Sequence, residues 1–324
     1  MANEKVGQSV KPGNPEAWRI AELEREVREL RRTNEALRVY VARELEPGPE
    51  IPASARSTVK FRALGPIEAV VGGRVVDLGA PKQRALLALL VSKVGQPVAV
   101  DLIVEELWDG KPPPSALTSL HAYVANLRRV LEPGRAPRTP PTVLRTYGRG
   151  YLLDSRAAEV DVHRFSERAV AGWQALDWGD PQYAVNEFEA ALAMWRGQAY
   201  SEVADTTCVR PDVARLEELR LSVVEGRCAA LLAAGAHEIA VAELEAFLQT
   251  HPLREYGCEL LSLALYRAGR QADALAVLRT NQKRLADELG IDPRPALQLL
   301  EKQILNHAPS LDWQPHPRAV AKSA

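Results

Sequence analysis

The chain has 324 residues, of which 46% are hydrophobic and 26% charged, and its formal net charge at pH 7 is −1. This composition is typical of a soluble globular protein, and the length is enough for roughly two domains. The sequence contains no apolar run of about 18 residues, no N-terminal apolar segment, and an odd number of cysteines without metal-ligand spacing. We therefore expect a cytoplasmic protein that has no membrane span, no metal site and no cofactor.

The charge is unevenly distributed along the chain. Residues 1–57 carry 10 Lys or Arg and 10 Asp or Glu, residues 58–154 carry 13 and 8, and residues 155–324 carry 18 and 24. The three net charges are therefore 0, +5 and −6. A mildly basic middle segment favours a local anionic partner, although a patch of this size is weak evidence when it stands alone.

A heptad pattern runs through residues 15–45. Apolar side chains occupy the a and d positions, apart from one asparagine at a. A lone a-position Asn, with β-branched residues at other a positions and Leu at d, is typical of a parallel two-stranded coil and predicts a homodimer. The coil has only about three heptads, and the alternative is one amphipathic helix packed on its own domain. The expected seam is Ile20, Leu23, Val27, Leu30, Asn34, Leu37 and Val41.

A sheet-forming pattern begins at Val59, after a stretch rich in Pro, Gly and small polar residues. We expect residues 1–14 to be disordered and residues 46–58 to form a linker. Beyond the linker, apolar residues alternate with polar ones on both sides of Gly72 and Gly73. This pattern predicts a small antiparallel sheet with a hairpin turn at the glycines.

Three helices and a hairpin are expected after the strands. Pro81 marks the start of a helix of about 12 residues, Asp101 is the candidate N-cap of the second helix, and the third covers residues 115–131. A short glycine-containing hairpin at 143–153 closes the segment. Strands, three helices and a hairpin in this order predict a winged helix-turn-helix over residues 59–154.

Residues 155–308 have a helical pattern with an internal repeat. Three residues recur 34 positions later, and an earlier, more distant copy begins near Gly179. This period, with small residues where two helices meet, is typical of tetratricopeptide helices. The predicted fold is mainly α with a small β component: a short coiled coil, a winged helix and a tetratricopeptide-like all-α domain, with a disordered tail at 309–324. The repeated residues are Gly235, Ala240 and Leu244, then Gly269, Ala274 and Leu278.

The third helix has two contrasting faces. Leu120, Val124, Leu127 and Leu131 form one apolar stripe, flanked by Leu117 and Tyr123. The other arc has small, amide, hydroxyl and guanidinium side chains, and no acid occurs between Asp109 and Glu132. Such a face suits the major groove of DNA, and packing against a neighbouring helix is the alternative. The candidate DNA-contacting residues are Thr118, Ser119, His121, Ala122, Asn126, Arg128 and Arg129.

The hairpin and the first helix carry further candidate DNA contacts. Arg145 and Arg149 bracket Tyr147 in a turn that could enter the minor groove or bind phosphates, although an incidental charged loop would look the same. Lys82 and Arg84 stand at a helix start, where the helix dipole favours a phosphate. The agreement of these features in order and charge makes DNA binding the leading interpretation.

Several stretches taken together resemble the Streptomyces antibiotic regulatory protein family over about residues 59–312. They include "LHAYVANLRRVLEPG", "YGRGYLL", "EVDVHRF" and "LALYRAGRQADALAVLRTNQ". The resemblance implies an OmpR-type winged helix joined to a bacterial transcriptional activation domain. It makes 115–131 the recognition helix and 143–153 the wing, and it implies that the loop with Trp108 and Lys111 contacts polymerase.

The same resemblance implies an activator of a secondary-metabolite (antibiotic) gene cluster. Such activators bind direct repeats in promoter DNA near the −35 region and recruit RNA polymerase holoenzyme through its sigma subunit. The N-terminal coil is a departure from the short members of the family. It puts the usual assembly of the family in question.

An enzyme is disfavoured, because the chain has no phosphate-binding loop of the form G-x-x-x-x-G-K, no zinc-ligand spacing and no G-x-S-x-G. The second hypothesis is a protein-interaction adaptor, in which the helical repeats are the working surface and the winged helix is degenerate. The acid-free face and the wing arginines favour the activator over this adaptor.

Overall fold

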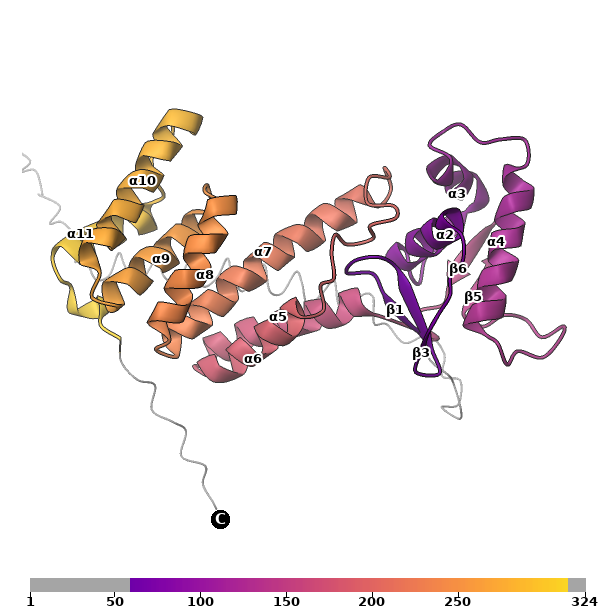
Figure 1. Cartoon of the computed structure of the whole chain (residues 1–324), viewed down its shortest axis with the longest axis horizontal. Helices are drawn as coiled ribbons and strands as arrows, with labels where there is room; N and C mark the ends of the chain where they lie inside the picture. Colours follow the sequence, from indigo (N-terminus) through magenta and orange to yellow (C-terminus); the bar gives the residue numbers. More distant parts are fainter. Residues whose placement is uncertain (1–58, 314–324) are drawn as a thin grey trace, which may run out of the picture. The chain divides into compact units, whose positions relative to one another are not determined.

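The computed structural model describes residues 59–313 (Figure 1). The expected coil at 15–45 with its seam, the linker at 46–58 and the last residues from 314 lie outside this range. The described part contains two small sheets, a group of three helices and a longer series of helices, in the predicted order. The predicted fold class of a winged helix followed by a helical domain is thereby confirmed for these residues.

The first sheet joins the start of the winged-helix part to the first long helix of the series. Its strand order is β3-β2-β1-β7, and β7 pairs with β1 in parallel while the other pairs are antiparallel. Gly72 and Gly73 have φ of 57° and 80°, as a two-residue hairpin loop requires. The fourth strand lies beyond the predicted domain end at 154. The strands are β1 (Val59–Arg62), β2 (Glu68–Val71), β3 (Arg74–Val76) and β7 (Ala158–Val160).

The three-helix group follows the sequence prediction, with one difference at its second helix. Pro81 is the first residue of α2, as predicted. The second helix does not use Asp101 as its N-cap: the helix begins two residues earlier than that cap predicts, after Ala99, and Asp101 lies in its first turn. The reason is a short strand, because Val98 pairs with Tyr151 and keeps the chain extended up to the helix. The elements are α2 (Pro81–Ser92), β4 (Pro97–Ala99), α3 (Val100–Leu107) and α4 (Ala116–Leu131).

The second sheet consists of β4 and the predicted hairpin, β5 (Leu144–Tyr147) and β6 (Gly150–Leu153), in the order β4-β6-β5. Tyr147 pairs with Gly150, which leaves a two-residue loop whose first residue, Gly148, has φ of 54°. A Cβ on Gly150 would lie 2.2 Å from the carbonyl oxygen of Val98. Glycine is therefore required there because β4 approaches the hairpin backbone too closely for a side chain.

The helical series confirms the repeat. Helices α5 and α6, α7 and α8, and α9 and α10 pack as neighbours. Gly235 and Gly269 have φ of 86° and 79° at the turns, and Ala240 and Ala274 are fully buried where the paired helices meet. No helix in the described range is both long and apolar enough for a bilayer. The bounds are α5 (Asp161–Asp177), α6 (Pro181–Leu192), α7 (Arg210–Ala233), α8 (His237–Thr250), α9 (Glu255–Arg267), α10 (Gln271–Leu289) and α11 (Pro295–Leu305).

Residues 309–313 differ from the predicted disordered tail. They form a short 3-10 helix, η1 (Pro309–Leu311), and continue to Trp313. Leu311 is buried, and the indole Nε1 of Trp313 donates to the carbonyl oxygen of Ala233 at 3.1 Å. The sequence gives little sign of this, because a single Leu and a single Trp lack periodicity. We call residues 309–313 the strap.

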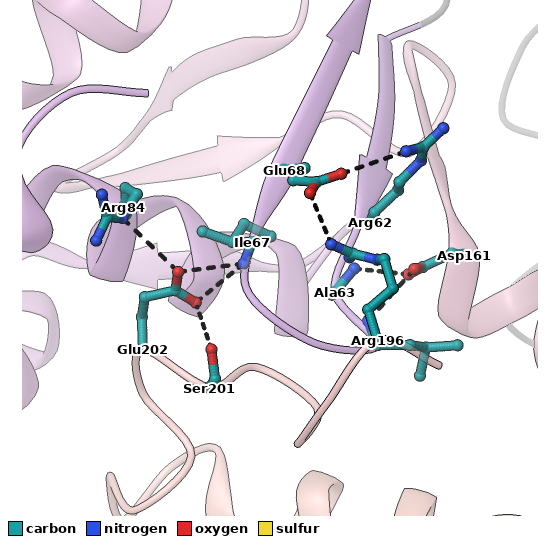
Figure 2. A network of polar contacts seen from close by, with 10 residues as sticks. Arg62, Ala63, Ile67, Glu68, Arg84, Asp161, Arg196, Ser201 and Glu202 are labelled. Atoms are coloured by element: carbon teal, nitrogen blue, oxygen red, sulfur yellow. Dashed lines mark hydrogen bonds and ion pairs between the residues drawn. The ribbon is translucent and has the colours of Figure 1, made fainter. Parts of the chain in front are cut away.

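The loop after β1 is bonded directly to the helical series, and we call this contact the joint (Figure 2). The carboxylate of Asp161, the first residue of α5, accepts from the backbone N–H groups of Ala63 at 2.8 Å and Leu64 at 3.3 Å. In return, the backbone N–H of Arg196 donates to the carbonyl oxygen of Leu64, and that of Tyr200 to the carbonyl oxygen of Ala63. Four backbone groups of a buried loop are thus satisfied by the other part of the chain.

Charged side chains continue the joint on either side of this loop. Glu202 accepts from the backbone N–H of Ile67 at 3.0 Å and lies 3.7 Å from the Nε of Arg84. Arg196 Nη1 lies 2.9 Å from Glu68 Oε1, and the other oxygen of Glu68 is 3.3 Å from Arg62 Nη1 (Figure 2). Helix α2 and the first sheet are therefore tied to the segment between α6 and α7.

Candidate nucleic-acid interface

Helix α4 buries the predicted stripe and presents its other side outward. It packs on α2, α3 and β5. One flanking residue differs from the prediction: Leu117 is 52% exposed, whereas its neighbour Ala116 is buried. Ala116 takes its place in the core. The buried residues are Ala116, Leu120, Val124, Leu127 and Leu131.

The outward face of α4 holds most of the predicted DNA-contacting residues. Ser119 is half-buried and the others on this face are exposed. The first acid after the helix, Glu132, accepts hydrogen bonds from the backbone N–H and the hydroxyl of Thr142. The acid nearest to α4 in sequence is thus engaged with a loop, and the face keeps its neutral and cationic character. Its exposed members are Thr118, His121, Ala122, Ala125, Asn126 and Arg129.

Asn126 is oriented by a residue that the sequence analysis did not select. Its Nδ2 lies 3.4 Å from the Oε1 of the buried Gln83, and the Nε2 of Gln83 donates to the carbonyl oxygen of Leu78 at 2.9 Å. A buried amide that is fixed at one end limits the rotamers of its partner. A polar residue within the apolar pattern of α2 was the signal that could have identified Gln83.

Arg128 turns toward the wing rather than outward. Its Nε donates to the carbonyl oxygen of Leu144 at 2.9 Å, and its Nη2 donates to the hydroxyl of Thr146 at 2.8 Å. The guanidinium also lies 5.8 Å from the ring centre of Tyr151. Burial is the largest influence on its pKa, which it lowers. Arg128 therefore connects α4 to both strands of the hairpin.

Arg145 also has a partner inside the protein. Its Nη1 lies 3.0 Å from Asp154 Oδ2, and Arg156 binds the same carboxylate through its Nε and Nη2. Hydrogen bonds, first of all from Arg156, lower the pKa of Asp154 to about 2. The Asp-x-Arg spacing at the end of the hairpin is a local signal for Asp154. This carboxylate anchors the base of the wing.

The tip of the wing is exposed. Tyr147 is 60% exposed and Arg149 is also exposed. The carbonyl oxygen of Arg149 accepts from the backbone N–H of Val100 at 3.0 Å. The backbone of the tip is thus held against the start of α3, and the Arg149 guanidinium forms no ion pair with an acid among the described residues. Figure 1 shows the hairpin beside α4.

The two predicted phosphate-binding residues on α2 have protein partners. The Nζ of Lys82 donates to the carbonyl oxygen of Leu107 at 2.6 Å and lies 5.2 Å from the ring centre of Trp108. Arg84 points to Glu202 in the joint. The ammonium group of Lys82 thus lies at the last turn of α3, where a positive charge stabilises the helix end. Both residues therefore contribute to the structure, and Lys82 remains exposed enough to contact an anion as well.

The predicted polymerase-contacting loop joins α3 to α4. Trp108 is half-buried beneath Lys82, whereas Lys111 is exposed. Between them, Asp109 and Gly110 have φ of 50° and 70°, which turns the chain sharply after α3. The loop is consequently a defined projection whose cationic end faces solvent.

Comparisons with known proteins identify both parts. A family model described as "Transcriptional regulatory protein, C terminal" matches residues 73–153, and one described as "Bacterial transcriptional activator domain" matches residues 160–305. "Regulatory protein AfsR" of Streptomyces coelicolor is 38% identical over 278 residues, or 82% of this chain and 27% of that protein. "Regulatory protein DnrI" of Streptomyces peucetius is 37% identical over 257 residues, or 78% of this chain and 94% of that protein.

A solved structure agrees with the described fold. "Mycobacterium tuberculosis EmbR in complex with low affinity phosphopeptide" matches with a TM-score of 0.70 at 37% identity. The match covers 78% of this chain and 66% of that one. The chain thus spans about two thirds of EmbR and about a quarter of AfsR.

Proposed function

The chain belongs to the Streptomyces antibiotic regulatory protein family and is a transcriptional regulator, and from this premise we propose that it is a sequence-specific DNA-binding activator. The proposed target is a secondary-metabolite gene cluster, because curated relatives named as Streptomyces regulators match most of the described chain. The bound element is double-stranded promoter DNA with direct repeats near the −35 region.

The observation that carries this proposal is the outward face of α4. It is exposed, it has no acid, and it lies beside a hairpin with an exposed arginine at its tip. Small residues such as Ala122 and Ala125 allow the helix backbone to approach base edges, while Asn126 and Arg129 can donate to purine acceptors. Arg149 at the wing tip fits a phosphate or the minor groove. A helix that only packs within the protein does not require this set of residue types on its solvent-facing side.

The contacts in the protein divide the candidate residues into two groups. Thr118, His121, Asn126 and Arg129 on α4, with Arg149 on the wing, are proposed to touch DNA. The remaining cations are proposed to act mainly as positioning residues, since their guanidinium or ammonium groups bind α3, the hairpin or the joint. This second group is Lys82, Arg84, Arg128 and Arg145.

A gel-shift titration with promoter DNA tests the proposal. We expect Arg129→Ala and Arg149→Ala each to weaken binding by about 1–3 kcal/mol. Arg164→Ala is the matched control, because Arg164 is also exposed but lies on α5 and pairs with Glu159. Wild-type affinity in both test variants would favour the adaptor, in which the winged helix is degenerate.

We further propose that the expected coil brings two chains together at one promoter. A parallel coil has two-fold symmetry, whereas direct repeats need DNA-binding domains that face the same way. The 13-residue linker could extend to roughly 40 Å, compared with about 34 Å for one turn of DNA. The linker therefore leaves the two domains free to adopt the same orientation while the coil raises their local concentration.

Deletion of residues 1–45 separates this assembly from the DNA contact itself. Binding to a site with two repeats should weaken more than binding to a site with one repeat, because only the former gains from the tethered second domain. Titration of both DNA probes with the shortened chain gives the comparison. An equal loss on both probes would contradict the assembly and leave the single-site contact intact.

Recruitment of RNA polymerase is proposed to use the loop between α3 and α4. Lys111 is exposed at this loop, and Trp108 gives it a fixed base. Lys111→Ala should reduce promoter activity in a reconstituted transcription assay with holoenzyme and leave DNA affinity unchanged. A parallel fall in DNA affinity would assign the lysine to DNA instead.

A further inference from the structure

A cavity of about 610 Å³ lies at the end of the helical series, away from the joint. Its walls come from the start of α8, the end of α9 and the turn after it, the start of α10, His307 after α11, and the strap. A cavity in this size range can take a small molecule. The described fold does not need it to position α4 or the wing. Its side chains therefore have no role in the proposed DNA contact.

Two opposite charges line this cavity without pairing. Burial lowers the pKa of Arg267, and the charge of the nearby Asp312 partly offsets that effect. The guanidinium makes one hydrogen bond to a described residue, from its Nε to the carbonyl oxygen of Leu311 at 2.9 Å. Arg267 and Asp312 form no ion pair with each other or with another described side chain. The Nη groups of a partly desolvated arginine and an exposed carboxylate thus remain available in one cavity.

The walls add an unsatisfied nitrogen and two aromatic rings. The Nε2 of His237 is inaccessible to solvent and has no hydrogen-bond partner in the described range. Burial lowers the pKa of His237, which favours its neutral ring at pH 7. The His237 ring meets Trp313 edge to face with 5.8 Å between centroids, and Tyr266 lines the same space. A buried polar atom without a partner is uncommon in folded proteins. Because solvent does not reach this nitrogen, Arg267 and Asp312 are the charged groups through which a ligand would be bound.

The strap fixes the aromatic wall in place. Trp313 packs so closely on the α7–α8 turn that a Cβ on Gly235 would lie 2.7 Å from its ring. Its indole N–H bond to the carbonyl oxygen of Ala233 holds the adjoining part of the ring. The cavity is therefore bounded by a rigid aromatic surface on one side and by the separated charges of Arg267 and Asp312.

We propose that this cavity binds a free α-amino acid with an apolar or aromatic side chain. Arg267 would bind the α-carboxylate, Asp312 the α-ammonium group, and Trp313 with Tyr266 the side chain. A single anion would meet repulsion from Asp312, and a single cation would meet repulsion from Arg267. A zwitterion satisfies both charges at once, which is the reason for choosing this chemical class.

Titration of the full chain with three related probes tests the site. L-Phenylalanine carries both charges, 3-phenylpropanoate lacks the ammonium group, and phenethylamine lacks the carboxylate. The readout is the NMR signal of the Trp313 indole N–H, assigned by its loss in Trp313→Phe, since the chain has six tryptophans. We expect saturable binding of phenylalanine that is at least about tenfold tighter than binding of either single-charge probe.

Two variants should then show a crossed pattern. Arg267→Gln should weaken phenylalanine and 3-phenylpropanoate by about tenfold and strengthen phenethylamine, because it removes both the carboxylate partner and the positive charge that repels the amine. Asp312→Asn should weaken phenylalanine and phenethylamine and strengthen 3-phenylpropanoate, because it removes the ammonium partner and the negative charge that repels the carboxylate. Arg270→Gln is the matched control, because Arg270 stands next to the site in sequence but pairs with Asp273 and does not line the cavity. It should bind as the wild type does.

Three results would overturn the proposal. One is the absence of a saturable shift with phenylalanine up to about 20 mM, a range that covers weak small-ligand binding. Another is equal affinity for all three probes, and the third is unchanged phenylalanine affinity in Arg267→Gln. DNA affinity measured in parallel keeps the two proposals separate, because neither variant touches α4 or the wing.

Discussion

The outward face of α4 and the joint use arginine in opposite ways. On α4 and the wing, Arg129 and Arg149 are exposed, and the acids nearest to them in sequence, Glu132 and Asp154, are bound by other residues. At the joint, Arg196 and Arg84 lie beside Glu68 and Glu202. The difference arises from residues that are distant along the chain, since Glu202 is 135 positions from the Ile67 backbone it binds. An arginine is thus available to an external anion only where folding brings no carboxylate to it.

The largest effect is expected from breaking the joint at Asp161. This carboxylate is 9% exposed and accepts from two backbone N–H groups. Asp161→Ala would leave both donors buried without a partner and lower the free energy of unfolding by about 2–5 kcal/mol. Denaturant unfolding followed by circular dichroism measures the change.

Asp177→Ala is the matched control for this prediction. Asp177 ends the same helix and is exposed, so its loss should change stability by less than about 0.5 kcal/mol. A loss in Asp161→Ala as small as in the control would show that the joint contributes little. The contrast between the hydrogen-bonded joint and the exposed face of α4 would then lose its energetic basis.

Local patterns predicted most of the fold, because their causes are local. The Pro81 helix start, the Gly72–Gly73 turn, the stripe of α4 and the 34-residue repeat all follow from residue spacing and backbone preference. The pairing of β7 with β1 and the order of the strap depend on contacts between distant segments. Such contacts produce no periodic pattern in the sequence, so residue spacing does not predict them.

The candidate DNA-contacting site could be predicted from the sequence only in part. The face of α4 was visible because the absence of acids is a property of the sequence itself. The inward direction of Arg128, Arg145 and Arg84 could not be predicted from the sequence. Their partners are a backbone carbonyl, a hydroxyl and carboxylates that only folding brings close to them. Charge and position identify a cation, and only the fold shows what it is bonded to.

Arg128→Ala should give the next largest loss of stability. It also tests whether Arg128 touches DNA itself or positions the wing. Loss of its bonds to Leu144 and Thr146 should reduce the free energy of unfolding by about 1–2 kcal/mol. DNA binding should weaken as well, because the hairpin is released from α4. Denaturant unfolding and gel shift on the same preparation give both values. A variant with weaker DNA binding at unchanged stability would instead place Arg128 directly on DNA.

The two regions should also respond to acid in opposite directions. The pKa of Asp154 beneath the wing is lowered from 3.8 to about 2, chiefly by its hydrogen bond with Arg156, so its contribution to stability is lost as the pH falls through this interval. Burial raises the pKa of Asp161, so its contribution is greatest in acid and is lost as the pH rises through its folded-state pKa.

Unfolding free energies between about pH 5 and pH 3 separate these two contributions. In the wild type, Asp154 binds a proton in the unfolded chain at a higher pH than in the folded chain, and this difference lowers stability in acid. Asp154→Asn removes the titrating group and should therefore make the fall in stability toward acid less steep. Asp161→Asn should make the same fall steeper. The same slope in both variants and the wild type would mean that neither carboxylate titrates differently on folding.

The salt dependence of DNA binding tests most directly which arginines face DNA. The slope of log K against log salt concentration reports the number of phosphates neutralised by the protein. We predict that Arg149→Ala reduces the magnitude of this slope by about 1, while Arg84→Gln, which removes a cation held by Glu202, leaves it unchanged. A reduced slope in Arg84→Gln together with an unchanged slope in Arg149→Ala would contradict the account.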